Sequence, residues 1–126
     1  MMNIEKQIQY WINGSNEDLI TSELLIANNR YLHGLFWCHL TIEKSLKALV
    51  VKSTGEIPPK THNLIWLLGK TDIQINPEIE NLIGSLMVYQ LEGRYPEQYP
   101  STPSKELALE IFTQTKEFHQ WLMKKL

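Results

Sequence analysis

The charged side chains with the clearest helical spacing are Glu43, Lys44 and Lys47. Glu43 and Lys47 are four residues apart, a spacing at which an acid and a base form a favourable ion pair on one helical face. Lys44 and Lys47 could instead contact a phosphate, because the segment from Lys44 to His62 holds four lysines and one acid, Glu56. The pattern therefore permits either an internal ion pair or a binding site for a nucleotide or nucleic-acid phosphate.

Two further side chains suit phosphate chemistry. His62 follows Thr61, a predicted helix N-cap, so the positive end of the helix dipole would disfavour the imidazolium cation. Neutral His62 could then donate or accept a hydrogen bond. Arg94 lies just beyond the predicted end of a helix, where its guanidinium can bind the last carbonyls of that helix, an internal carboxylate such as Asp18 or Glu43, or an external phosphate. Both residues thus have a structural and a functional interpretation.

The remaining histidines and the cysteine do not indicate a metal site. His33, His39 and His119 fall within helical stripes and lack metal-ligand spacing with any carboxylate. The lone Cys38 excludes a disulfide framework and a multi-cysteine metal site, which favours a reducing interior. No glycine-rich phosphate loop, pair of catalytic carboxylates or Ser-His-Asp order can be assembled. We therefore expect neither a metal nor a cofactor.

The bulk composition is that of one ordinary globular domain. The chain has 126 residues, 43% of them apolar and 21% charged, and a net charge of −2, which does not predict a broad nucleic-acid or membrane surface. The first residues lack the apolar run of a signal peptide, and no later stretch approaches the roughly 20 apolar residues of a membrane span. A single domain over residues 1–126, cytoplasmic and without a membrane partner, is the expectation.

Hydrophobic periodicity predicts five helices and no strand. The predicted helices span residues 3–28, 31–53, 61–69, 76–92 and 104–125. The second span is apolar on most of its circumference, so other helices must surround it or part of it must meet another subunit. It is therefore the predicted central element of an all-α domain.

The first predicted helix contains Gly14, at which two outcomes are open. The apolar stripe keeps its phase across Gly14, which favours one unbroken helix. Alternatively, the helix breaks near Gly14, and Ser15 caps a second helix with Asp18 completing the capping pattern three residues later.

Six short motifs make the chain resemble the HEPN domain family in their order and spacing. They are Trp11, Asp18-Leu19, Arg30-Tyr31, Glu43-Lys44-Ser45-Leu46-Lys47-Ala48-Leu49, Thr61-His62-Asn63-Leu64 and Arg94-Tyr95-Pro96. The resemblance implies a five-helix, up-and-down bundle, commonly a homodimer, in prokaryotic cells. HEPN proteins are often encoded beside a small nucleotidyltransferase, the two acting as partners or as toxin and antitoxin. Many members are metal-independent ribonucleases, and others have been proposed to bind nucleotides or the substrate of the partner enzyme.

The ribonuclease motif of that family is incomplete in this chain. The motif is an arginine followed, after four to six residues, by a histidine, so that arginine stabilises charge on a phosphate while histidine moves protons. Here Arg94 is present, but Tyr99, Pro100 and Ser101 occupy the positions where the histidine would stand. A phenol with an unperturbed pKa of about 10 is a poor base at neutral pH. The departure argues against RNA cleavage by this motif.

The resemblance and the missing histidine together predict a non-catalytic HEPN subunit. It would form a homodimer, bind a small nucleotidyltransferase in a toxin-antitoxin-like module, and offer cations to a nucleotide or RNA phosphate. The predicted phosphate-binding residues are Lys44, Lys47, His62, Arg94 and Tyr95, with Asp18 and Glu43 as their structural partners.

Two alternatives remain. The first is a metal-independent ribonuclease toxin in which His62 replaces the lost histidine and acts with Arg94. The second is a purely structural assembly module, in which the charges form an internal salt-bridge network around Asp18 and Glu43.

Overall fold

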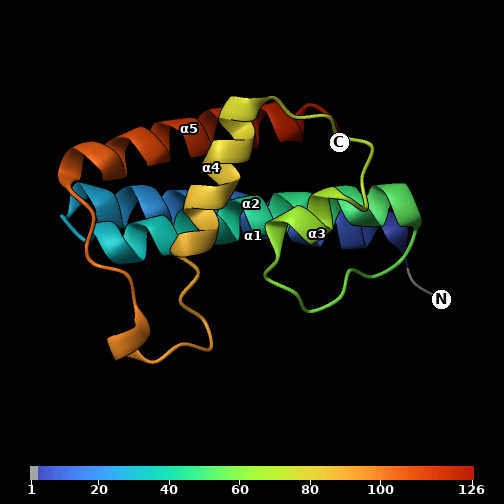
Figure 1. The fold of residues 1–126 in the computed structure, drawn as a ribbon. Helices are drawn as coiled ribbons and strands as arrows, with labels where there is room; N and C mark the ends of the chain where they lie inside the picture. Colours follow the sequence, from blue (N-terminus) through green and yellow to red (C-terminus); the bar gives the residue numbers. More distant parts are fainter. Residues whose placement is uncertain (1–2) are drawn as a thin grey trace.

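The computed structural model describes residues 3–126, which form five α-helices and one short 3-10 turn without any strand. The elements are α1 (Ile4–Ala27), α2 (Tyr31–Thr54), α3 (Leu64–Leu68), α4 (Pro77–Val88), η1 (Pro96–Gln98) and α5 (Lys105–Met123). The long helices α1, α2 and α5 lie alongside one another, whereas α4 crosses them steeply (Figure 1). The predicted all-α, five-helix fold is confirmed, although α4 makes it less regular than a simple up-and-down bundle. No helix in this part of the chain has the length and apolar character needed to cross a bilayer.

α2 is the central helix, as its apolar circumference predicted. It contacts α1, α3, α4 and α5, and it contributes more buried residues than any other helix among residues 3–126. Leu35, Ile42 and Leu46 are completely buried, and burying each such side chain contributes roughly 1.5–3 kcal/mol. Cys38 is buried as well, where burial raises the pKa of its thiol to about 11. Cys38 is therefore a core residue and not a reactive thiol.

α1 is unbroken, which decides between the two outcomes left open at Gly14. A Cβ atom on Gly14 would lie 3.0 Å from Cδ of Lys44, so the missing side chain makes room for Lys44 to cross α1. Ser15 lies inside the helix and is buried, with its Oγ 2.9 Å from the carbonyl oxygen of Thr41 on α2. The hydroxyl that could have capped a second helix instead joins α1 to α2.

α3 begins later than the sequence predicted. Residues 61–69 were expected with Thr61 as the N-cap, but the helix starts at Leu64, and Asn63 caps it by accepting a hydrogen bond from the Trp66 amide (3.0 Å). Asparagine is a somewhat better N-cap than threonine, and the Thr61 hydroxyl instead accepts from the Asn63 amide (3.1 Å). His62 therefore lies in the loop before α3, and its placement in the first turn of a helix was wrong.

α4 ends earlier than predicted, at Val88 and not at residue 92. The chain leaves the helix at Tyr89 and turns at Gly93, whose φ of +81° is a left-handed conformation that glycine adopts readily. The loop that follows is interrupted by the single turn of η1. The ends of α1, α2 and α5 lie within two residues of the predicted bounds, the usual uncertainty of a helix end.

Candidate functional site

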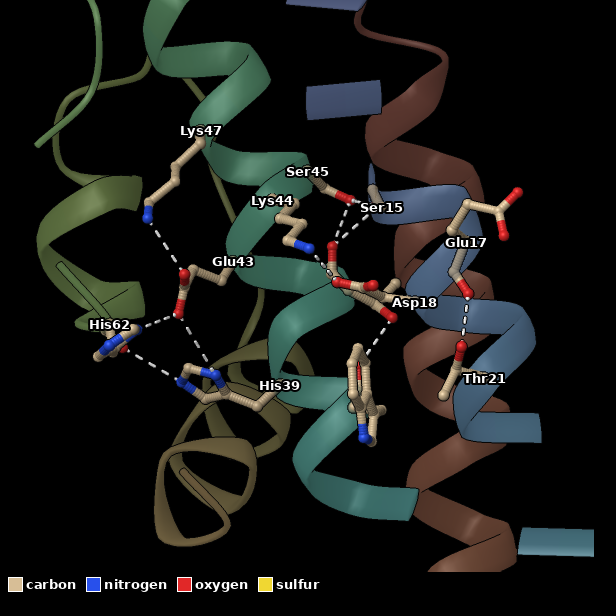
Figure 2. Close-up of polar contacts among 12 residues, drawn as sticks. Ser15, Glu17, Asp18, Thr21, His39, Glu43, Lys44, Ser45, Lys47 and His62 are labelled. Carbon is tan, nitrogen blue, oxygen red and sulfur yellow. Dashed lines mark hydrogen bonds and ion pairs between the residues drawn. The ribbon is translucent and has the colours of Figure 1, made fainter. Parts of the chain in front are cut away.

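Neighbouring charged residues of α2 belong to two separate groups, drawn in Figure 2. Successive helical residues point about 100° apart, so Glu43 and Lys44 face different neighbours, whereas Glu43 and Lys47 share a face. We call the group formed by Glu43, Lys47, His39 and His62 the Glu43 cluster. Asp18 of α1 and Lys44 of α2 form the second group, the Asp18 pair. The rotation of successive residues about the helix axis therefore divides the charged patch seen in the sequence into two groups.

The Glu43 carboxylate is the centre of its cluster. It is almost completely buried, with one oxygen, Oε2, 3.1 Å from the Lys47 ammonium. The other oxygen, Oε1, accepts a hydrogen bond from Nδ1 of His62 at 2.9 Å. A buried carboxylate is tolerated only where charged or hydrogen-bonding partners compensate for its lost hydration, and here both oxygens have one.

Lys47 is enclosed by its partners. Its side chain is buried, and its ammonium lies 5.1 Å from the centroid of the Trp11 ring as well as beside Glu43. A cation over an indole face is attracted by the negative charge of the ring face. Lys47 therefore joins α1 to α2 through Trp11, in addition to neutralising Glu43.

His39 supports the cluster as a neutral side chain. Its Nε2 lies 3.1 Å from the backbone carbonyl oxygen of His62, and since a carbonyl only accepts, Nε2 carries the proton. Burial lowers the pKa of His39 to about 4, against the smaller opposing effect of the Glu43 charge. Nδ1 is then unprotonated and faces Glu43 Oε1 at 3.6 Å without a hydrogen bond. His39 holds the loop that carries His62.

His62 bridges two carboxylates from different parts of the chain. Nδ1 donates to Glu43, while Nε2 lies 3.3 Å from Oε2 of Glu92, in the segment after α4. The His62 side chain is 37% exposed, so it reaches solvent although a buried acid fixes its Nδ1. The Nε2 contact becomes a charged hydrogen bond when the ring is protonated, because both nitrogens then donate. His62 thereby connects α2, the loop before α3 and the segment after α4.

The Asp18 pair faces α1. The Lys44 ammonium lies 2.8 Å from Oδ2 of Asp18, and part of the Lys44 side chain remains exposed. Burial raises the pKa of Asp18 above its ordinary value, and the Lys44 partner offsets only part of that effect. The pair thus joins α1 to α2 at the point where Gly14 provides space.

Arg94 is engaged by the backbone. Its Nη1 donates to the carbonyl oxygens of Val88 and Gln90, each at 3.1 Å, and its Nη2 donates to that of Gln98. Of the three kinds of partner considered for Arg94 from the sequence, the structure shows backbone carbonyls: that of Val88 at the end of α4, and those of Gln90 and Gln98 in the segment that follows. Tyr95 beside it is 69% exposed. The arginine fixes the course of the loop and leaves Tyr95 on the surface.

The structure brings together some of the residues singled out in the sequence and separates others. Lys47 and His62 meet at Glu43, Lys44 meets Asp18, and Arg94 follows two residues after Glu92. Sequence reasoning missed His39 and Glu92. The spacing of His39 four residues before Glu43 was a usable signal, because such residues share a helical face. For Glu92 there was no local signal, since its contact with His62 depends on how the two loops meet.

No group of three or more histidine, cysteine or acidic side chains among residues 3–126 is arranged to hold a metal ion. The side chains of the Glu43 cluster can themselves pair charges and transfer protons. His62 is the member that combines a fixed orientation with access to solvent.

Comparison with known proteins agrees with the fold and the motifs. The family model of the HEPN domain matches residues 8–126. The chain is also similar in structure to TT1696 from Thermus thermophilus, known from a crystal structure, with a TM-score of 0.80 over 95% of this chain and 98% of that one. Their sequence identity is 19%, so this likeness shows the fold alone. A comparison with curated proteins found no match. Because the family model covers nearly all of the sequence, the chain belongs to the HEPN domain family.

Proposed function

We propose that this protein is a non-catalytic HEPN subunit that works beside a small nucleotidyltransferase and binds a nucleotide or RNA phosphate. The observation that carries the proposal is the state of Arg94, whose guanidinium is engaged by three backbone carbonyls. The position that a ribonuclease histidine would occupy holds Tyr99. An arginine used for loop structure and a tyrosine in place of the base favour binding over phosphate cleavage.

The proposed phosphate contacts fall on two sides of α2. On one side, the partly exposed His62 contacts Glu92, two residues before Arg94, and shares Glu43 with the buried Lys47. On the other side lies Lys44, whose side chain is partly exposed. An RNA strand is long enough to follow both sides, and Tyr95 offers an exposed ring on which a base can stack. Asp18 and Glu43 act as the structural partners that hold these cations.

Titration with a labelled short RNA and with nucleotides tests the binding role. We expect His62→Gln, Lys44→Met and Tyr95→Ala each to weaken RNA binding several-fold. The matched control is Lys116→Met, which removes one exposed lysine from α5 outside both groups. Equal, weak binding by the wild type and all four variants would refute a phosphate-binding surface. The partner role is tested by purifying the tagged protein from its native cells: a co-purifying nucleotidyltransferase is expected, and recovery of the homodimer alone contradicts it.

A ribonuclease remains the second candidate because of the contact between Glu43 and His62. A buried carboxylate that accepts from Nδ1–H fixes the imidazole and leaves Nε2, the nitrogen that a general base would use, beside the exposed Glu92. Cleavage of labelled RNA in the presence of a chelator distinguishes the two functions. Activity in the wild type that falls by about 10²-fold or more in His62→Ala would establish the enzyme, since removing a general base has an effect of that order. No cleavage by either protein supports the binding subunit.

A further inference from the structure

A pocket separate from the Glu43 cluster lies between the start of α4 and the second half of α5. Its volume is about 290 Å³, and Ile79, Leu82 and Phe118 supply its apolar lining. Figure 1 shows the first turn of α4 against the C-terminal half of α5. Glu92, which contacts His62, follows the opposite end of α4. A helix of this length separates the two regions by roughly 16 Å at 1.5 Å per residue.

The polar lining of the pocket is acidic. Glu78 of α4 and Glu117 of α5 line it, and no lysine, arginine or histidine does. Neither carboxylate forms an ion pair with any residue in the described range 3–126. The amide side chains of Gln74 and Gln114 add hydrogen-bonding oxygens. The lining is thus complementary to a positively charged group that also donates hydrogen bonds.

The aromatic wall of the pocket is suited to the same kind of group. Trp121 lines the pocket and stacks on Phe118, with ring centroids 6.0 Å apart and an interplanar angle of 24°. The Lys125 ammonium already lies 4.6 Å from the Trp121 centroid, and Lys125 lines the neighbouring hollow and not this pocket. Lys125 shows that the Trp121 indole attracts a cation, and the pocket places two carboxylates, Glu78 and Glu117, in the same lining as the Phe118–Trp121 pair.

We propose that this pocket binds an arginine side chain presented by a partner protein. A guanidinium is planar, so it can pack flat against the aromatic wall formed by Phe118 and Trp121 while its N–H groups donate to Glu78 and Glu117. Its methylene stem would cover the apolar lining made by Ile79 and Leu82. A lysine ammonium would gain less, because it is a more strongly hydrated point charge without a flat face. The proposal does not depend on phosphate binding at the Glu43 cluster.

Nuclear magnetic resonance titration tests the pocket with N-acetyl-arginine amide as the probe. The indole N–H signal of Trp121, assigned by its loss in Trp121→Phe, reports binding. We expect a saturable shift with the arginine compound and a response about tenfold weaker with N-acetyl-citrulline amide, which keeps the shape but lacks the charge. The double variant Glu78→Gln/Glu117→Gln should lose most of the affinity, whereas Glu110→Gln, an exposed acid on α5 outside the pocket, should retain it.

Three results would overturn the assignment. Equal responses to the arginine and citrulline compounds would show that charge is not recognised. Unchanged binding by the double variant would place the probe elsewhere on the surface. A fall in molecular size on Glu78→Gln/Glu117→Gln substitution, measured by light scattering, would mean that a second copy of this chain occupies the pocket. Both exchanges retain size and lie on the surface, so a folded double variant is expected, and circular dichroism checks it.

Discussion

The Glu43 cluster and the Asp18 pair are built from the same chemistry in different surroundings. Each pairs an acid with a lysine of α2, and the two acids are about equally buried, at 4% and 6% side-chain exposure. The lysines differ: Lys47 is 7% exposed, whereas Lys44 is 29% exposed. A buried lysine that loses its counter-ion cannot be hydrated, whereas a partly exposed lysine can. The access of the lysine to water therefore decides how much stability is lost when the acid of each pair is removed.

The largest effect should follow from Glu43→Ala. The substitution leaves Lys47 buried without a counter-ion and removes the acceptor of His62, so the free energy of unfolding should fall by about 3–5 kcal/mol. Urea unfolding at pH 7 measures it. The control is Glu43→Ala/Lys47→Met, which removes both charges and should recover at least half of the loss. A loss below about 1 kcal/mol in the single variant would show that the Glu43 cluster is no more essential than a surface pair.

Acid should lower the free energy of unfolding through the protonation of His39. The pKa of folded His39 is about 4, below the 6.5 of the unfolded chain, so between these values the unfolded state binds the extra proton. Stability is therefore lost as the pH falls from 6.5 to 4, by up to about 3 kcal/mol from this group. Glu43, Lys47 and His62 are the charged or titratable groups that face it.

Unfolding curves of wild type and His39→Gln across this pH range measure the effect. The variant retains a donor near Nε2 and should show a flatter pH dependence. His119, whose pKa burial also lowers, contributes in the same direction and remains in both proteins. Parallel curves for the two proteins would remove His39 as the cause.

A smaller effect is expected for Asp18→Asn in the second group. Burial has raised the pKa of Asp18, so the folded state gains little from the ionised carboxylate, and Lys44 can turn to water. We predict a loss of about 1 kcal/mol or less at pH 7, measured by the same urea unfolding. A loss as large as that of Glu43→Ala would abolish the distinction between the two groups.

The smallest expected change, and a favourable one, is Gly14→Ala. Alanine is better than glycine in a helix by about 1 kcal/mol, and the only close neighbour of the new Cβ is the flexible Lys44 side chain, at 3.0 Å from Cδ. We expect a gain of about 0.5 kcal/mol, read as a higher midpoint of thermal unfolding. Gly34→Ala is the control in α2, where the new Cβ would lie 2.5 Å from Cγ1 of buried Ile26 and should destabilise. Destabilisation by Gly14→Ala would mean that Lys44 is held as rigidly as Lys47.

Part of the candidate site was predictable because it follows helical periodicity. Glu43 and Lys47 share a face at a spacing of four residues, and the structure shows the ion pair that this spacing predicts. The interpretation of Arg94 was left open between carbonyls, an internal carboxylate and a phosphate. Only the course of the chain after Val88 selected the carbonyls, since no local pattern states which backbone atoms a loop will bring near a guanidinium.

The error at His62 has a different origin. Thr61 and Asn63 are both acceptable N-caps, and sequence alone cannot choose between caps two residues apart. The position of the cap matters, because it places His62 in a loop, from which its side chain bridges Glu43 and Glu92. Likewise, Ser15 fits a capping pattern in the sequence, yet its hydroxyl reaches the Thr41 carbonyl once α1 packs on α2.

Apolar periodicity and short motifs are properties of neighbouring residues, so they were enough to predict the five helices, the central position of α2 and membership of the HEPN family. Tertiary packing was needed to establish which cations are buried, which carboxylate each one meets, and that an acidic aromatic pocket forms between α4 and α5. The physical reason is that desolvation and charge pairing depend on residues far apart in the chain. Glu43 and Lys44 are adjacent in sequence, and packing against the loop before α3 on one side and α1 on the other gave them different partners.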